Sequence, residues 1–182
     1  MSLIESNKTA DGTDAKVSKK IQLADKRFGC GFVTVIKNAG KPNEEVIMRN
    51  GKNLLVNVGI AYFHKLCCAS PAATTYGATD IIALSTTSST VVAGTTWDNE
   101  IITAGLARNV GSSTTHSTTA NATTLVKTFT ATGAITAARS GLFNTATVSA
   151  TGEEYSHIKN FTTSVTLATD DTLQVTWILT LG

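Results

Sequence analysis

The sequence is poor in charged residues, in proline and in long apolar runs. Asp, Glu, Lys and Arg make up 15% of its 182 residues, whereas an average soluble protein has about 25%. No apolar run approaches the roughly 18 residues of a membrane-spanning helix, so we expect no membrane partner. Hydrophobic residues reach 42%, with 14 glycines and only 2 prolines. This composition excludes a disordered chain and favours a β-rich protein that hides much of its surface against partners.

Cysteine is also rare, and its three positions form no metal-binding pattern. Cys30 stands alone, whereas Cys67 and Cys68 are sequence neighbours that would rarely pair with each other. No CxxC or Cys–His spacing typical of a zinc site is present. We therefore expect reduced, unligated thiols in a protein made in a reducing cytoplasm. Residues 1–10 are polar, which predicts that the chain has no signal peptide.

The sequence lacks the motifs that bring catalytic groups together. It has no Walker loop, no GxGxxG or GxSxG motif and no EF-hand pattern. The histidines belong to no recognisable motif: they are His64, His116 and His157. The acidic pairs stand beside turns and are expected to face solvent: they are Glu44-Glu45, Glu153-Glu154 and Asp170-Asp171. We expect a protein that is not an enzyme, with no catalytic residues, no cofactor and no metal site.

Basic residues are concentrated in the first part of the chain. Residues 1–73 hold 11 Lys and Arg against 6 Asp and Glu, a net charge of +5. Residues 74–182 hold 4 against 7, a net charge of −3, and the two parts sum to +2. Because the basic residues are interleaved with acids, this pattern favours an acidic protein partner or plain solvation over nucleic acid.

The first 27 residues are predicted to form an extended N-terminal arm. Their only large aliphatic residues are Leu3, Ile4, Val17, Ile21 and Leu23. So few apolar side chains cannot offset the entropy that the segment loses when it becomes ordered. We therefore expect a neighbouring subunit to order the arm at 1–27, and a β-sandwich domain to follow at 28–182.

A hairpin and a helix are predicted after the arm. Residues 32–36 and 45–48 are rich in β-branched side chains, and the turn residues between them indicate a β-hairpin. Asn50-Gly51 is expected to end the second strand. Residues 53–68 predict the only substantial helix, because apolar residues recur there at helical spacing. These residues are Leu55, Val58, Gly59, Tyr62, Phe63 and Leu66.

Threonine dominates the remaining chain and favours strands. It supplies 29 of the 109 residues from 74 to 182, and its β-branched side chain suits an exposed strand face. Loops rich in Ser, Thr, Gly and Asn, notably 109–122, separate the apolar segments. This spacing predicts a mainly β fold, an antiparallel β-sandwich that is jelly-roll-like. The predicted strands lie near 79–85, 100–108, 123–131, 134–143, 157–167 and 171–181.

The last predicted strand has the clearest pattern. One of its faces is wholly apolar, and the other is mostly polar. Because a shift of one residue would turn the apolar face into water, the register should be strongly specified. We expect Trp177 to be largely buried, with neighbours from the strand at 157–167. The apolar face consists of Leu173, Val175, Trp177, Leu179 and Leu181.

Residues 97–100, Trp-Asp-Asn-Glu, admit two interpretations. In one, they form a sugar-binding tip, because Trp stacks on sugars and carboxylates bind sugar hydroxyls. In the other, they form a turn in which Trp97 packs against the end of the sandwich. The sequence favours the packed turn.

Several short motifs follow one another between residues 50 and 182. They are NLLVNVG (53–59), DIIAL (80–84), TWDNEI (96–101), GLAR (105–108), SGLFN (140–144) and DTLQVTW (171–177). Their order resembles a family of small β-sandwich structural proteins of tailed bacteriophages and related archaeal viruses. In that family, a GLF motif followed by a segment such as gDtLtvtWt closes the sandwich. Its usual glycine-rich loop is replaced here by Ser85-Thr86-Thr87.

This resemblance implies a virion structural protein without catalytic residues. We expect a homo-oligomeric capsid-decorating or surface-layer component in many copies, located in the virion after synthesis in the host cytoplasm. Its partners would be other virion proteins such as the major capsid protein or tail proteins. An alternative is a receptor- or glycan-binding module of a phage tail or fibre, which an exposed aromatic patch near Trp97 or Tyr76 would indicate. A bacterial surface adhesin is a second alternative, disfavoured by the expected lack of a signal peptide.

Overall fold

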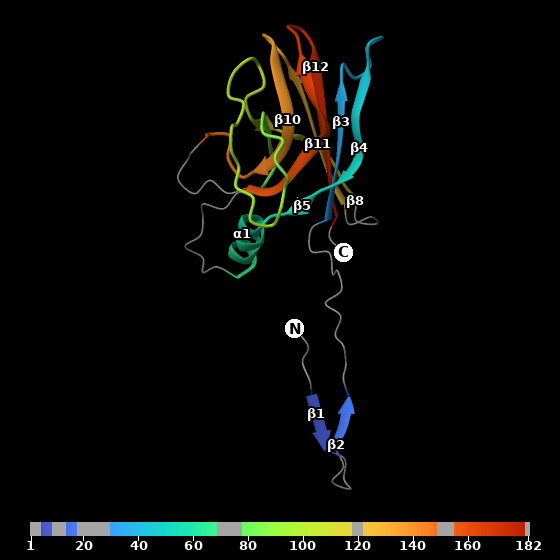
Figure 1. Cartoon of the computed structure of the whole chain (residues 1–182), viewed down its shortest axis with the longest axis vertical. Helices are drawn as coiled ribbons and strands as arrows, with labels where there is room; N and C mark the ends of the chain where they lie inside the picture. The colour runs from blue at the N-terminus through green and yellow to red at the C-terminus, as the bar shows by residue number, and fades with distance from the viewer. Residues whose placement is uncertain are drawn as a thin grey trace.

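Two antiparallel β-sheets and one short helix make up the main body of the computed structural model (Figure 1). The structure describes residues 5–8, 14–17, 30–68, 78–117, 122–148 and 155–180. The two sheets pack over a shared core, which confirms the predicted mainly β, antiparallel sandwich with one helix.

Each of the two sheets has five strands. The β12 sheet has the order β4-β3-β12-β9-β8, and the β10 sheet has the order β5-β11-β10-β6-β7. The chain changes sheet after β4, β7, β9 and β11, so neither sheet is one continuous stretch of sequence. The β12 sheet contains β3 (Cys30–Lys37), β4 (Glu45–Lys52), β8 (Ser112–Ser117), β9 (Ala122–Thr130) and β12 (Thr172–Thr180). The β10 sheet contains β5 (Leu54–Leu55), β6 (Ile81–Ser85), β7 (Asn109–Val110), β10 (Ile135–Phe143) and β11 (Tyr155–Leu167).

A single large hydrophobic cluster fills the space between the sheets. Leu173, Val175 and Trp177 of β12 are all fully buried in it, which confirms the alternation predicted for the last strand. The indole Nε1 of Trp177 donates a hydrogen bond to Ser140 Oγ on β10 at 3.1 Å. The ring of His157 on β11 meets the Trp177 ring edge-on, with ring centres 6.1 Å apart. The predicted contact between Trp177 and the 157–167 strand is thus confirmed, and it crosses the core from one sheet to the other.

Helix α1 (Asn57–Cys68) begins four residues later than predicted. The two residues of β5 pair with β11 instead, and the side chain of Asn53 accepts a hydrogen bond from the backbone N–H of Gly31. Gly59 and Tyr62 are buried, in agreement with the predicted apolar face. A Cβ at Gly59 would lie only 2.2 Å from the carbonyl oxygen of Ser156. Glycine at this position therefore lets the helix pack directly on the backbone of β11.

The predicted hairpin is confirmed as β3 and β4, but β4 continues further than expected. Asn50 has a positive φ of 46°, and the pairing shifts register between Val33 and Val35. The hydroxyl of Thr34 accepts a hydrogen bond from the N–H of Asn50 at 3.1 Å. The Asn50-Gly51 dipeptide thus makes an irregularity within β4 instead of ending it. The strand can continue because the hydroxyl of Thr34, on the neighbouring strand, accepts the hydrogen bond of the Asn50 N–H.

Two predictions for the segment between β6 and β9 were wrong. The predicted strand at 100–108 is a loop, in which Ala104 and Gly105 have φ values of 53° and 76°. Strands require a negative φ, and the apolar residues Ile101 and Leu106 are buried from a loop instead. The predicted loop at 109–122 contains β7 and β8, and β8 extends the β12 sheet by pairing with β9.

Within the predicted arm, the structure describes β1 (Glu5–Lys8) and β2 (Asp14–Val17) (Figure 1). These two strands pair with each other as a separate antiparallel sheet. The rest of 1–27 lies outside the described residues, and so do the side chains of the three cysteines. The ordering of the arm by a neighbour and the reduced state of the thiols therefore stay predictions.

Candidate functional site

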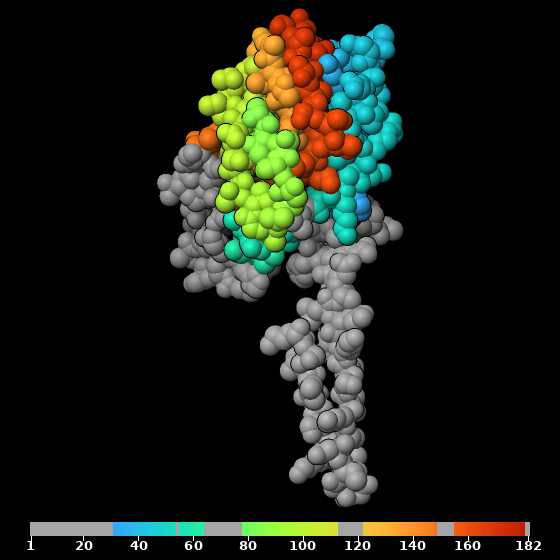
Figure 2. Space-filling view, viewed as in Figure 1, coloured from blue at the N-terminus to red at the C-terminus, as the bar shows by residue number. Residues whose placement is uncertain are grey.

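A long loop covers the outer face of the β10 sheet. This covering loop, residues 86–108, joins β6 to β7 and appears in green to yellow-green on the near face of the molecule (Figure 2). Beneath it lies a second, smaller hydrophobic cluster of Ile81, Ala83 and Phe143, with Trp97 and Tyr155 packed against it. The β10 sheet is thus covered on both faces, which explains why all of β6 and most of β10 are buried.

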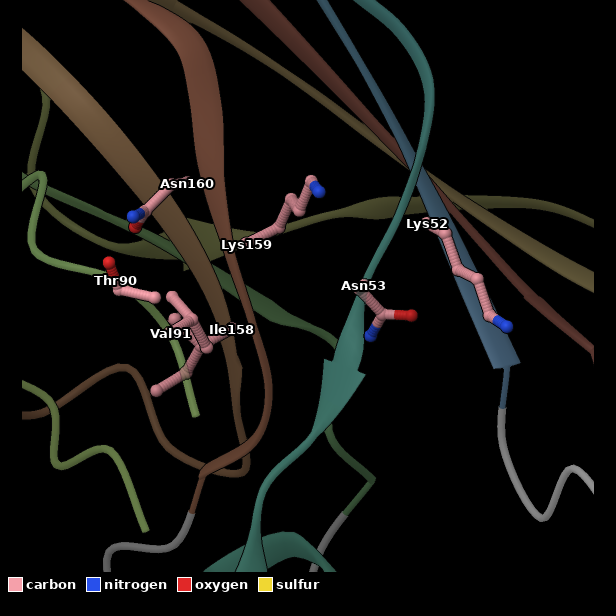
Figure 3. Close-up of a pocket in the computed structure, with 7 residues that line it drawn as sticks. All are labelled: Lys52, Asn53, Thr90, Val91, Ile158, Lys159 and Asn160. Carbon is pink, nitrogen blue, oxygen red and sulfur yellow. The ribbon is translucent and has the colours of Figure 1, made fainter. Parts of the chain in front are cut away.

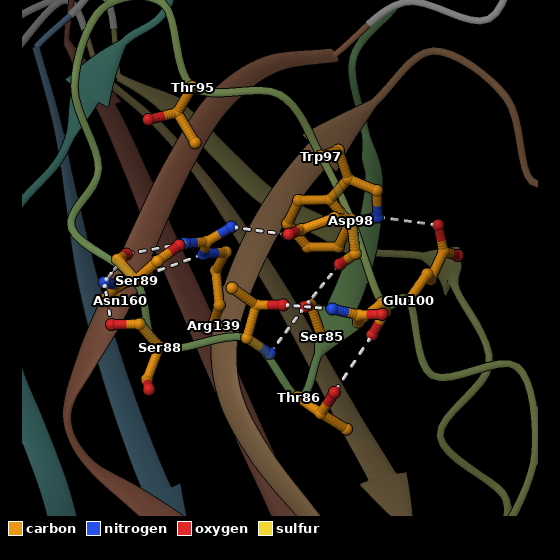
Figure 4. A network of polar contacts seen from close by, with 12 residues as sticks. Ser85, Thr86, Ser88, Ser89, Thr95, Trp97, Asp98, Glu100, Arg139 and Asn160 are labelled. Atoms are coloured by element: carbon orange, nitrogen blue, oxygen red, sulfur yellow. Dashed lines mark hydrogen bonds and ion pairs between the residues drawn. The ribbon is translucent and has the colours of Figure 1, made fainter.

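Arg139 ties the covering loop to the β10 sheet and is fully buried. Its guanidinium donates to the carboxylate of Asp98 at 3.0 Å and to the backbone carbonyl of Ser89 at 2.7 Å. Its Nε donates to Oδ1 of Asn160 on β11 at 2.8 Å. Figure 4 shows these bonds converging on one guanidinium from two parts of the loop. Burial lowers the pKa of Arg139, and the nearby carboxylate of Asp98 opposes this shift.

Glu100 fastens the second half of the covering loop. Its carboxylate accepts a hydrogen bond from the indole Nε1 of Trp97 at 2.8 Å. It also pairs with the guanidinium of Arg108, and both side chains are more than nine-tenths buried. The same guanidinium lies 4.0 Å from the centre of the Phe143 ring, in a cation–π arrangement. Each charged group is thus satisfied within the chain, so this pair serves to hold the loop in place.

Trp97 packs inward against the β10 sheet. Its ring meets that of Phe143 nearly perpendicularly, with ring centres 5.1 Å apart. A Cβ at Gly141 would lie 2.7 Å from the Trp97 ring, so only glycine leaves room for the indole. These contacts agree with the packed-turn interpretation of residues 97–100. Tyr76, the other aromatic residue considered for a sugar-binding tip, lies outside the described residues.

Hydroxyl groups fasten the start of the covering loop at Ser85-Thr86-Thr87. The Ser85 hydroxyl donates to the carbonyl of Asp98 at 2.7 Å and accepts from the N–H of Thr87 at 3.0 Å. The side-chain amide of Asn99 donates to the Thr87 hydroxyl at 2.9 Å. Side-chain hydrogen bonds therefore hold this end of the covering loop.

The remaining sequence candidates do not form a catalytic cluster among the described residues. His157 is buried in the core, where its Nδ1 lies 2.8 Å from the hydroxyl of Ser156. The side chains of His64 and His116 and the pair Glu153-Glu154 lie outside the described residues. In the part of the chain that the structure describes, no three His, Cys, Asp or Glu side chains group closely enough to hold a metal ion.

Only one residue of the Asp170-Asp171 pair faces solvent, whereas both were predicted to do so. Asp170 is exposed, but the carboxylate of Asp171 accepts hydrogen bonds from the N–H of Ala168 and from Nδ2 of Asn38, both at 2.9 Å. It also pairs with Lys37 Nζ at 3.1 Å. These interactions, the backbone hydrogen bond first, lower the pKa of Asp171 to about 2. Asp171 therefore joins the end of β3 to the turn between β11 and β12.

The outer face of the β12 sheet differs from that of the β10 sheet. The strands β3, β12 and β9 present three rows of three side chains on it, and none of these nine side chains is charged. Eight are half-buried and one, Thr128, is exposed. We call these nine residues the open face. The rows are Phe32, Ile178 and Thr124, then Thr34, Thr176 and Val126, then Ile36, Gln174 and Thr128.

The two arginines that hold the covering loop were not identified from the sequence. A usable signal was present, because Arg139 is the only charged residue in the predicted strand 134–143 and Arg108 is the only one in residues 101–108. A charged residue in such a position is buried only if it finds a partner. The partners Asp98 and Glu100 were noted in the sequence, but only as a turn or a sugar-binding tip.

Comparisons with known proteins leave the family of this chain open. No protein-family model, no curated protein and no solved structure matches it. The described residues include no helix that is both long enough and apolar enough to cross a membrane.

Proposed function

We propose that this chain is a structural subunit of a virion, a capsid-decorating or surface-layer component that assembles in many copies. The observation that carries this proposal is the open face of the β12 sheet. It is a continuous area on three neighbouring strands, and it holds no charged side chain.

The composition of the open face resembles the centre of a protein interface more than a solvated surface. A soluble surface is designed with charged residues at about a quarter to a third of its positions, whereas charged residues are depleted at interface cores. Phe32, Ile36 and Ile178 on the open face are apolar and only half-buried within the chain. Burying them against a neighbour would remove apolar area from water, which is the main driving force of association.

A second copy of this chain is the occupant that we propose for the open face. Sheets pack face to face at about 10 Å when their facing side chains are small enough to interdigitate, and threonine and valine meet this condition. Val46 pairs with Ile36 and extends the apolar area onto β4, where it is 38% exposed. Lys52 pairs with Phe32 at the edge, where a charged rim is normal.

The motifs that resemble the virion family support the same role. Trp97, Gly141 and Phe143 pack together, and Glu100 and Arg108 fasten the loop above them. These residues make a subunit with a fixed shape, which repeated assembly with neighbours requires. The resembled motifs thus have a structural explanation in this chain.

A charge placed in the centre of the open face tests the assembly. We expect the parent chain to form oligomers at micromolar concentration and Thr176→Lys to be monomeric, measured by light scattering after size exclusion and by native mass spectrometry. Thr163→Lys, on an exposed position of β11, is the matched control and should assemble like the parent. A parent that stays monomeric, or a Thr176→Lys variant that assembles normally, would contradict the proposal.

Membership of a virion is tested on particles. Particles purified by density gradient from the natural source should contain this chain in many copies, quantified by mass spectrometry against a known capsid component. We expect Thr176→Lys to lower its incorporation and Thr163→Lys to leave it unchanged. Complete absence of the parent chain from purified particles would overturn the virion assignment.

A further inference from the structure

Assembly in many copies needs a second contact besides the open face. Two copies that stack open face against open face use the same surface on both partners, so this contact closes on itself and gives a dimer. Another surface must therefore join one dimer to the next. The edges of the two sheets are candidates, because an edge strand presents unpaired backbone N–H and C=O groups to its surroundings.

Three of the four sheet edges are unsuited to pairing with another chain. β5 and β7, at the edges of the β10 sheet, have only two residues each. β4 has eight residues, but Glu45, Arg49 and Lys52 are charged and exposed on it. Short strands and charged side chains are common ways in which proteins keep sheet edges from pairing.

Positive charge also lies where β4 continues into β5. The chain passes from one strand to the other through Asn53, beside a pocket that Lys52 and Lys159 both line (Figure 3). A strand that paired here would take water away from these ammonium groups, which is costly. This side of the sandwich is therefore protected against pairing.

β8 differs from the other three edges. Its six residues, Ser112–Ser117, pair with β9, and β8 is the last strand of the β12 sheet among the described strands. Its sequence, SSTTHS, contains no Asp, Glu, Lys, Arg or Pro. Both β4 and β8 have an irregularity in their pairing, so charge is what distinguishes these two long edges.

The start of β8 is fixed to the body of the sandwich. Gly111, which joins β7 to β8, is buried, and its N–H donates a hydrogen bond to the carbonyl of Asp80 at 2.8 Å. A Cβ at Gly111 would lie 3.1 Å from Cδ1 of Ile82. The first residue of β8 thus leaves the buried part of the chain at a defined position, which lowers the entropy cost of pairing with a further strand.

The open face continues onto β8. Ser112 lies opposite Val126 in the register of β8 and β9. Thr115 lies opposite Thr124 in the same way. Because residues directly opposite each other share a face of the sheet, both lie on the side that carries the open face. Lys52 bounds this side at β4, whereas at β8 the uncharged surface reaches the edge of the sheet, where a further strand would extend it.

We propose, on the basis of the assembly through the open face, that β8 pairs antiparallel with β8 of a second copy and joins two β12 sheets into one. A twofold axis relates the two strands, so each meets an identical and equally uncharged strand. The other described edge strands fit this place less well. β1, β2 and β4 each contain charged residues, and β5 and β7 are too short.

The β8 contact is small, because it involves six residues on each side. Small contacts are weak on their own, so this contact joins dimers that the open face has already formed. Alternation of the two contacts then builds larger assemblies from one kind of chain.

Sedimentation velocity of the full chain over a concentration series tests the β8 contact. We expect the parent to be dimeric at about 5 µM and to form tetramers or larger species at about 500 µM, the range of a weak contact. With all six residues paired, the twofold axis passes between Thr114 and Thr115. Thr114→Lys should stay dimeric over the whole range, because two lysines would then lie close together across the axis.

The choice of Thr114 limits other effects of the substitution. The register of β8 and β9 leaves Thr114 without a partner, so a change there disturbs their pairing least. Thr163→Lys, at an exposed position of β11, is the control and should form the larger species like the parent.

A mixture of opposite charges identifies the partner strand. Thr114→Lys and Thr114→Glu should each stay dimeric alone, whereas an equimolar mixture should form the larger species again. The reason is that a lysine of one dimer then meets a glutamate of the other across the axis. A mixture that stays dimeric would show that β8 does not meet β8, and the proposal would be overturned.

Hydrogen exchange of the parent chain needs no variant. The amides of β8 should exchange several-fold more slowly at the high concentration than at the low one, whereas the amides of β4 should not change. Equal exchange of β8 at both concentrations would overturn the β8 contact.

Failure of the β8 contact can be told from failure of the open face. A parent that is monomeric at every concentration contradicts the open-face assembly and, with it, the β8 contact. A parent that forms dimers but no larger species overturns the β8 contact alone, and Thr176→Lys should then still separate those dimers.

Discussion

The two sheets share one core, but their outer faces differ: a loop of the chain covers one, and the other is left open. The outer face of the β10 sheet lies beneath the covering loop and holds a fully buried arginine, Arg139, together with a small aromatic cluster. The outer face of the β12 sheet holds nine uncharged side chains that stay partly exposed. Charge therefore occurs on the covered face, where the chain supplies its own counter-charge, and it is missing from the nine central positions of the open face. The buried charges mark a surface that the chain completes itself, and the uncharged rows mark a surface that we propose a neighbour completes.

The largest effect is expected beneath the open face, at Trp177. Trp177→Ala should lower the free energy of unfolding by about 3–5 kcal/mol, because it removes a fully buried ring from the core. Thr176→Ser, at the preceding residue of β12 and on the open face, should change it by less than about 0.5 kcal/mol. Denaturant unfolding of the purified variants measures both. If Trp177→Ala melts within about a degree of the parent, the division of β12 into a core side and an open side is wrong.

A smaller loss of folding stability is expected when the buried ion pair of Glu100 and Arg108 in the covering loop is broken. Glu100→Gln should cost about 3 kcal/mol, because Arg108 then keeps a buried charge without its counter-charge. The new amide oxygen can still accept from Trp97, which keeps the cost at the lower end of the range for broken buried pairs. Glu45→Gln, at an exposed position of β4, is the control and should be nearly silent. Equal stability of the two variants in urea would show that the covering loop does not depend on this pair.

Gly141→Ala tests the fit between the covering loop and its sheet. A methyl group 2.7 Å from the Trp97 ring should displace the indole and cost about 1–3 kcal/mol. Gly133→Ala is the matched control, since nothing lies within 4 Å of a Cβ there. Hydrogen exchange should show faster exchange of the loop amides of Thr86 and Ile101 in Gly141→Ala, with β12 unchanged. Equally slow exchange of these amides in both variants would contradict the proposed fit.

The smallest effect is a pH dependence of the folding stability. It comes from Asp171, in the turn between β11 and β12 that joins the two sheets. The pKa of Asp171 in the folded chain is lowered from 3.8 to about 2. Its ionised form therefore favours folding above about pH 4, and this contribution is lost as the pH falls toward 2. Melting curves from pH 6 to pH 2 should show a gap between the parent and Asp171→Asn that narrows in this window, whereas Asp170→Asn should follow the parent throughout. A gap that stays constant down to pH 2 would refute the assignment.

Some elements could be predicted from the sequence because local pattern decides them. The alternation in β12 has a period of two and one wholly apolar face, so any fold that buries this face gives the same strand. The β3–β4 hairpin is similarly local, since its strands and turn lie within residues 30–52. The interpretation of 100–108 as a strand was wrong because Ile101 and Leu106 are apolar for another reason. They fill the core from a loop whose path includes two residues with positive φ.

The sequence by itself determined that this chain is a mainly β, antiparallel protein with one helix and a core strand at its C-terminal end, because strand periodicity and apolar content act over a few neighbouring residues. Only the tertiary structure decided which outer face is covered and which is left open. That outcome depends on pairs far apart in the chain, such as Arg139 and Ser89, which are separated by 50 positions. Contacts of this kind form only when the strands have paired in the correct order and register. The free energy of burying an arginine is favourable only when those partners are already in place.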